Sequence, residues 1–192
     1  PLDVKKEFNL PEDAFVIINV ANNRRMKGIP YLMKAMNMLP AGLPIHLLLV
    51  GGNMDTKANL SLISSGGYKS NVHFVGFRDD VLNIVAASDV FASASIKGES
   101  ITKSIIEAMS LEVAPIITDI PGNVELCDHE DSGLVVKMKN PKELSDAVLR
   151  LYNDRSLCKK LAKNAKARIG SFLNTDRSIV EMKEFYHELM AE

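Results

Sequence analysis

The stretch FVIINVANNRRMKGIPYLMKAMNMLPAGLPIHLLLVGG, residues 15–52, carries the pattern that decides the fold. Its ends, at 15–21 and 45–50, are short apolar runs of the kind that buried strands show. Between them, residues 29–39 place apolar side chains at helical spacing. A strand, a helix and a second strand in this order form a βαβ unit, whose two strands lie parallel. The stretch therefore predicts an α/β fold built on a parallel sheet.

The same alternation continues along the chain to about residue 137. After Pro141 the apolar spacing is helical almost throughout. We therefore predict a doubly wound, Rossmann-like parallel sheet of about six strands, flanked by helices. The further strands are expected at 72–77, 89–95, 114–120 and 133–137, and the further helices at 80–88, 102–110, 141–154, 155–169 and 176–190, with one more polar helix between 52 and 72.

The last expected helix differs from the rest of the chain. One of its faces carries an apolar stripe that the predicted sheet does not need for its own core. We therefore expect residues 1–174 to form one domain, and the helix within residues 175–192 to cross to a surface outside that domain. The stripe consists of Ile179, Met182, Phe185, Tyr186 and Leu189.

Composition places the chain among soluble globular domains. It has 192 residues, of which 46% are hydrophobic and 24% charged, and a formal net charge of -1, so the overall charge favours neither nucleic acid nor an anionic membrane. No apolar run approaches the roughly 20 residues of a membrane span, and no signal peptide opens the chain. Because the first residue is Pro1 rather than Met, we expect a trimmed or processed piece.

Metal binding and disulfide formation find no support in the sequence. Cys127 and Cys158 stand outside any CxxC or His-containing ligand pattern, which fits a reduced cytoplasmic protein. No Asp-x-Asp motif occurs, and the four histidines show no useful ligand spacing. His46 and His73 are interpreted as ordinary strand or surface residues. We expect no metal and no cofactor.

Ligands of a doubly wound sheet bind at the carboxyl ends of the strands, so we expect the functional residues in the loops that follow the strands. After the first strand the sequence is NVANNRRMKG, without the GxGxxG dinucleotide fingerprint, and no GxxxxGK[ST] loop occurs anywhere. These absences disfavour a simple dehydrogenase or NTPase.

The first of these loops places Arg24, Arg25 and Lys27 at the start of a helix that begins near Gly28. A helix N-terminus carries about half a positive charge, so each nearby cation is unfavourable by roughly 0.3 to 1 kcal/mol unless an anion binds. Two interpretations remain open at this point: a phosphate site, or solvated charges that point away from the helix axis.

A second loop, KGESITKSIIEAMS at 97–110, also runs into a helix N-terminus. Ser100 or Thr102 can cap that helix, and its first backbone amides form an anion site. Lys103 and Glu107 are four residues apart and share a helix face. Taken alone, this pair is best explained as a surface ion pair in the weaker orientation.

At this point the chain resembles a known family, the retaining glycosyltransferases of the GT-B fold, group 1 or family 4 type, over almost its whole length. The family carries two glutamates separated by seven residues and followed by Ala-Met, which Glu99 and Glu107 reproduce. Its R-x-x-K-G loop is matched by residues 24–28. Further family-like segments follow in the expected order: VHFVGFRDDV, ASDVFASAS, PIITDIPGNVE and SGLVV.

The resemblance implies a role for each matched residue. Arg24 and Lys27 would hold the diphosphate of a nucleotide-sugar donor, and Glu107 would accept hydrogen bonds from the ribose. Glu99 would contact the donor sugar. The remaining donor contacts would come from the amides of Ile101, Thr102 and Lys103, from the backbone of Gly76, Phe77 and Arg78 at the edge of the base, and from Gly51 and Gly52 beneath the nucleotide, although a Gly-Gly pair after a strand also fits a simple turn.

One departure from the family's sequence pattern affects the expected contact with the donor sugar. Many relatives read E-G-F-G where this chain has Glu99-Ser100-Ile101-Thr102. Backbone amides are present whatever the side chain, so we expect the phosphate site at the start of this helix to be intact. The identity of the donor sugar stays open.

The resemblance implies an enzyme of hexosyltransferase type that transfers a sugar from a nucleotide diphosphate to an acceptor hydroxyl with retention, in polysaccharide or glycolipid biosynthesis. Its partners would be the donor and an absent N-terminal acceptor domain, without which we expect no activity. The location would be cytoplasmic, at the inner membrane face if the absent domain binds there. Two alternatives stay open: a GT-B sugar-nucleotide epimerase and a non-catalytic nucleotide-binding module.

Overall fold

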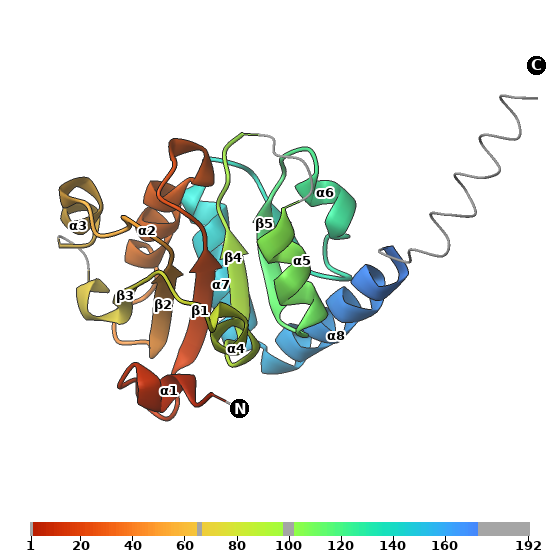
Figure 1. Cartoon of the computed structure of the whole chain (residues 1–192), viewed down its shortest axis with the longest axis horizontal. Coiled ribbons are helices and arrows are strands. Elements are labelled where there is room, and N and C mark those ends of the chain that lie inside the picture. The colour runs from red at the N-terminus through yellow and green to blue at the C-terminus, as the bar shows by residue number, and fades with distance from the viewer. Residues whose placement is uncertain (1, 65–66, 98–101, 173–192) are drawn as a thin grey trace, which may run out of the picture.

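The chain folds around one six-stranded parallel sheet, as the computed structural model in Figure 1 shows. The structure describes residues 2–64, 67–97 and 102–172. The strand order is β3-β2-β1-β4-β5-β6, and every neighbouring pair is parallel. The predicted fold class is therefore confirmed. The strands are β1 (Phe15–Val20), β2 (Ile45–Val50), β3 (Val72–Gly76), β4 (Val90–Ser93), β5 (Ala114–Thr118) and β6 (Leu134–Val136).

Helices cover both faces of this sheet. Side chains of α2, α3 and α7 pack on one face, and those of α1, α4, α5 and α6 pack on the other. The long helix α8 contributes to both faces. The helices are α1 (Val4–Glu7), α2 (Ile29–Asn37), α3 (Lys57–Ser64), α4 (Val81–Ala86), α5 (Lys103–Ser110), α6 (Asn123–Leu126), α7 (Pro141–Asn153) and α8 (Arg155–Phe172), with short 3-10 turns η1 (Arg25–Lys27) and η2 (Lys69–Asn71).

Burial on both faces explains why the strands read as continuous apolar runs. Successive side chains of a strand point to opposite faces. Phe15 and Ile17 of β1 accordingly enter the core beneath α2, while Val16 and Ile18 enter the core beneath α5. All four are fully buried, so the sheet is fixed from both sides and its strand ends have defined positions.

Most predicted elements are present with small shifts at their ends. The helices α1 and α6 and the turns η1 and η2 were not predicted, because each is too short to show a period. The helix expected at 176–190, with its apolar stripe, lies outside the described residues, so its proposed crossing stays a prediction. Within the described part of the chain, no helix has both the length and the apolar character to cross a membrane.

Candidate functional site

The sheet has one topological switch point, between β1 and β4. From β1 the chain proceeds through β2 to β3 on one side, and it then returns to place β4 on the other side of β1. At such a point the loops after the two central strands part toward opposite faces and leave a crevice for a ligand. Here these loops are the β1–α2 loop (residues 21–28) and the β4–α5 loop (residues 94–102), which are the two loops singled out from the sequence.

The two loops contact each other directly. Gly28 adopts a left-handed conformation with φ of 65°, and a Cβ atom at this position would lie 1.8 Å from the carbonyl oxygen of Ala94. The backbone amide of Ile96 donates a hydrogen bond of 2.8 Å to the carbonyl of Met26. Glycine at position 28 therefore sets the separation of the loops, and the hydrogen bond sets their register.

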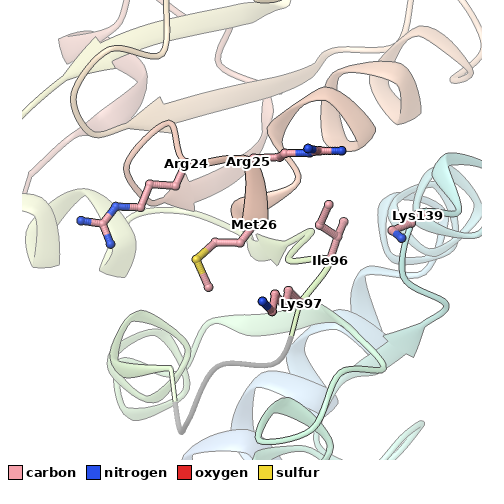
Figure 2. A pocket seen from close by; sticks show the side chains of 6 residues that line it. All are labelled: Arg24, Arg25, Met26, Ile96, Lys97 and Lys139. Carbon is pink, nitrogen blue, oxygen red and sulfur yellow. The ribbon is translucent and has the colours of Figure 1, made fainter.

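The cations of the β1–α2 loop lie at an open pocket. Arg24 and Arg25 are exposed, whereas Lys27 is half-buried. The pocket has a volume of about 540 Å³ and is lined by Arg24, Arg25, Met26, Ile96, Lys97 and Lys139, all of which Figure 2 shows. The Lys27 side chain is not among the residues that line this pocket. The predicted phosphate loop thus faces an open space at the switch point, and the pocket receives two further lysines that the sequence interpretation did not assign.

A buried chain of polar contacts places the N-terminus of α5 at the same crevice. The Thr118 hydroxyl donates to the carbonyl of Ser95 at 2.7 Å, and the Asn123 amide donates to the carbonyl of Thr118 at 3.2 Å. The Thr102 hydroxyl donates in turn to the Asn123 side-chain oxygen at 3.3 Å. Because Thr102, Thr118 and Asn123 are all buried, these bonds tie the start of α5 to the ends of β4 and β5.

Thr102 is the residue at the N-cap of α5, but its side chain makes no capping hydrogen bond. Of the two candidate caps, Thr102 does not serve as one, because its hydroxyl is directed to Asn123, and Ser100 lies outside the described residues. The first amides of a helix have no acceptor within the helix, and the Thr102 side chain does not occupy one of them. This arrangement keeps the start of α5 suitable for an anion.

Glu107 forms the expected ion pair within α5. Its Oε1 lies 3.3 Å from Nζ of Lys103, whose side chain is 89% exposed. Such an exposed pair contributes little to stability, so it does not by itself explain why Glu107 is there. Glu99 and Ile101, which the sequence assigned to the sugar and the phosphate, lie outside the described residues.

A second, more apolar pocket of about 230 Å³ lies at the ends of β1, β2 and β3. It brings together four of the predicted donor-binding residues: Gly51, Gly52, Phe77 and Arg78. The Phe77 ring is 79% exposed, which is unusual for a large apolar side chain and leaves its face available to a planar ligand. The remaining lining residues are Val20, Ala21, Asn22, Val50 and Val81.

Two residues of this pocket have structural explanations as well. A Cβ atom on Gly51 would lie 1.7 Å from the carbonyl oxygen of Ala21, so the close packing of two loops requires glycine there. Arg78 donates two hydrogen bonds to Asp80, at 2.7 and 2.8 Å, and one to Glu7 at 3.0 Å. These bonds raise the pKa of Arg78 above its ordinary value, and they engage its side chain, which leaves the backbone of this segment to face a ligand.

His46 and His73 lie on strands, as interpreted from the sequence, and the structure adds that their rings contact each other. His46 Nδ1 and His73 Nε2 lie 3.1 Å apart on the neighbouring strands β2 and β3. Burial, with the nearby His73 as a smaller cause, lowers the pKa of His46, and burial lowers the pKa of His73. Both rings therefore favour the neutral form, in which one donates to the other. In the described part of the chain no third His, Cys, Asp or Glu joins them to complete a metal site.

The comparison with protein families shows to which family the chain belongs. The family model for glycosyl transferases group 1 matches residues 3–168, which include both pockets and both loops. The chain belongs to this family.

Relatives of this glycosyltransferase family include two bacterial enzymes. An N-acetyl-alpha-D-glucosaminyl L-malate synthase of Bacillus anthracis is 24% identical over 189 residues, which span 98% of this chain and 49% of that protein. An N,N'-diacetylbacillosaminyl-diphospho-undecaprenol alpha-1,3-N-acetylgalactosaminyltransferase of Campylobacter jejuni is 31% identical over 162 residues, spanning 83% of this chain and 41% of that protein. The chain thus spans about half the length of the relatives it matches.

Solved structures of the GT-B type share the fold. HepE of Anabaena, crystallised with UDP-glucose, superposes with a TM-score of 0.82 at 24% identity, over all of this chain and 53% of that one. The C-terminal domain of a group 1 glycosyl transferase (LpcC) of Francisella tularensis superposes with a TM-score of 0.76 at 21% identity, over 88% of this chain and 90% of that one. The predicted GT-B C-terminal architecture is therefore confirmed.

Proposed function

We propose that this group 1 glycosyltransferase domain binds a nucleotide-diphosphate sugar, and that the complete protein transfers the sugar with retention to an acceptor hydroxyl. The observation that carries the proposal is the sequence of sites along one edge of the sheet. An apolar pocket with an exposed aromatic ring lies at β3-β2-β1, and a cationic crevice with a helix N-terminus lies next to it at β1-β4. A nucleoside diphosphate has its apolar and anionic parts in the same order.

The nucleoside would occupy the apolar pocket. Its base would lie against the exposed Phe77 ring, since stacking of a base on an aromatic side chain contributes roughly 1 to 3 kcal/mol. The open space at Gly52, where an added Cβ meets no atom within 4 Å, leaves room for the nucleotide to pass. Glu107, whose side chain is 27% exposed, would accept hydrogen bonds from the ribose hydroxyls.

The diphosphate would occupy the crevice at the switch point. Arg24, Lys27 and the first amides of α5 would contact it, and Glu99 would contact the sugar. As the glycosidic bond breaks, negative charge grows on the departing diphosphate, and fixed positive groups lower the barrier by stabilising that charge. This scheme requires no metal ion and no cofactor.

The acceptor would bind to a second domain. The chain spans about half of its relatives, and the acceptor site and the remaining catalytic groups are expected in the other half. We infer that the described domain alone transfers no sugar. The names of the two relatives contain L-malate and a sugar linked to diphospho-undecaprenol. For this protein we propose a hexosyl donor with a lipid-linked or polysaccharide acceptor. A cytoplasmic location, at the inner membrane face, belongs to the same proposal.

The proposal is tested by calorimetric titration of the chain with UDP, GDP and ADP and the corresponding monophosphates. One base should be preferred, and its diphosphate should bind more tightly than its monophosphate. A charge-assisted hydrogen bond contributes about 1.5 to 3 kcal/mol, so Lys27→Ala should weaken diphosphate binding about tenfold or more and leave nucleoside binding nearly unchanged. The matched control is Lys160→Ala, an exposed lysine on α8. Absence of binding by all three diphosphates would refute the proposed donor site.

A further inference from the structure

The pocket at the switch point contains more positive charge than the proposed donor accounts for. Arg24, Arg25, Lys97 and Lys139 all line it, whereas the donor diphosphate is assigned to Arg24 and Lys27. Each phosphate of a sugar nucleotide is a diester with a single negative charge, so these two cations and the dipole of α5 already balance it. The proposed donor therefore assigns no anionic group to three of the cations, Arg25, Lys97 and Lys139.

These three cations come from three different loops. Figure 2 shows that Arg24 and Arg25 point in opposite directions from the β1–α2 loop, with Arg25 directed to the side on which Lys139 lies. Lys97 enters the pocket from the β4–α5 loop. Because β6 is the edge strand beyond β5, the loop that carries Lys139 lies on the side of the crevice opposite to the apolar nucleoside pocket.

The position of Lys139 is fixed by its own loop. The Met138 amide donates to Asp119 Oδ1 at 2.7 Å, and the Lys137 amide donates to Glu143 Oε2 at 2.8 Å. Neither carboxylate lines the pocket. Lys139 itself has φ of 59°, in the left-handed region that favours glycine.

No carboxylate among the described residues pairs with Arg25, Lys97 or Lys139, and all three side chains are exposed. Other cations of the chain do have such partners, as Arg150 has in Glu130 and Lys166 has in Glu112. Cations gathered at one open pocket repel each other and favour an anion there. Two apolar side chains, Met26 and Ile96, complete the pocket, whose volume of about 540 Å³ exceeds what a phosphate group fills.

We propose that Arg25, Lys97 and Lys139 form a second anion subsite, beside the donor diphosphate, which binds a phosphate or diphosphate group of the acceptor. The inference rests on the proposed donor site, because that site defines what the subsite lies beside. It places the acceptor among anionic, phosphate-bearing molecules, whose other contacts would come from the second domain. Two sources share this chemistry, a lipid-linked diphosphate and a soluble phosphorylated acceptor.

The test is a titration of the chain with inorganic pyrophosphate while the preferred nucleoside diphosphate is present at saturation, at constant ionic strength. We expect pyrophosphate to bind without displacing the nucleotide. The double variant Arg25→Gln/Lys139→Gln should weaken this binding at least tenfold and change nucleotide affinity less than twofold. The control with the same loss of charge is Lys160→Gln/Lys163→Gln on exposed α8 positions, which should weaken pyrophosphate binding less than twofold.

Three results would overturn the subsite: pyrophosphate that competes with the nucleotide, pyrophosphate that does not bind, or equal losses in the two double variants. Failure of the donor proposal gives a different result from failure of the subsite. If the donor proposal fails, no nucleoside diphosphate binds, but pyrophosphate binding that depends on Arg25 and Lys139 still supports the subsite. A final arm replaces pyrophosphate by farnesyl diphosphate. Tighter binding than pyrophosphate assigns the subsite to a lipid-linked acceptor, and equal binding assigns it to a soluble one.

Discussion

Substituting Gly28 by alanine tests the contact that holds the two site loops together. The Cβ atom of the variant would lie 1.8 Å from the carbonyl oxygen of Ala94 and 3.1 Å from Cγ2 of Ile96. A backbone oxygen cannot rotate away as the end of a side chain can, so one of the two loops must move. The residue at position 28 also has φ of 65°, where alanine is less stable than glycine.

The two costs can be separated. The left-handed conformation costs an alanine roughly 1 to 2 kcal/mol, and overpacking of a buried contact typically adds about 1 to 3 kcal/mol. We therefore expect Gly28→Ala to lower the free energy of unfolding by about 2 to 5 kcal/mol. Gly42 is a matched control, because its φ of 81° imposes the same conformational cost while its Cβ would meet no atom within 4 Å. Gly42→Ala should lose only about 1 to 2 kcal/mol.

The measurements are urea unfolding of both variants and titration with the preferred nucleoside diphosphate under conditions where each remains folded. Gly28→Ala should bind the diphosphate more weakly than the parent, because the displaced loop moves Arg24 and Lys27 relative to α5. Gly42→Ala should bind it normally. Equal loss of stability in the two variants would refute the contact between the loops, and unchanged diphosphate affinity in Gly28→Ala would refute its role in positioning the cations.

Three further predictions concern side chains. Glu107→Gln should weaken the binding of a ribonucleoside diphosphate about tenfold, and the binding of its 2'-deoxy analogue less, because one charge-assisted hydrogen bond is lost; calorimetry measures both affinities. The control is Glu112→Gln, which removes the ion pair with Lys166 as Glu107→Gln removes the pair with Lys103, and it should change neither affinity. Equal losses for both nucleotides would refute the ribose contact. Because burial lowers the pKa values of His46 and His73, the folded state binds fewer protons than the unfolded state below the ordinary value of 6.5. The free energy of unfolding should therefore decrease as the pH is lowered through that range, by up to about 1.4 kcal/mol per pH unit for each histidine that stays neutral. His46→Gln/His73→Gln should flatten this dependence in urea unfolding between pH 7 and 5, and an unchanged slope would contradict it. Burial raises the pKa of Cys158 to about 12, so a thiol reagent at pH 8 should label it only after unfolding, and labelling at the rate of a free thiol would contradict the packing.

The fold could be predicted because burial on both faces leaves a strong signal in each strand. Runs such as 45–50 are apolar throughout, and the helix at 29–37 repeats its buried positions at helical spacing. Short elements give no such signal. The helix α1 has four residues, and only the Asp3 side chain, which accepts a hydrogen bond from the Lys6 amide, marks its start.

The site could be predicted only in part. The strand-end rule placed the β1–α2 and β4–α5 loops at one crevice, because parallel strands bring their carboxyl ends to the same edge. The same rule applied to β6 could have drawn attention to Lys139. The rule does not give side-chain direction, which separates Arg24 from Arg25 (Figure 2), and it does not give strand register, which brings His46 beside His73. Both depend on tertiary packing rather than on local pattern.

The topology itself explains why positive charge gathers in this crevice. The helix after β1 packs on one face of the sheet and the helix after β4 packs on the other, so α2 and α5 begin on opposite sides of the same gap with their N-termini toward it. Their dipoles converge there, and the β1–α2 loop adds Arg24, Arg25 and Lys27 instead of the acidic residues that usually stabilise a helix start. A cation at a helix start is unfavourable to the helix dipole, so an anion is favoured there. A ligand with more than one phosphate can interact with both helix starts, which is why the topology favours a diphosphate in this crevice.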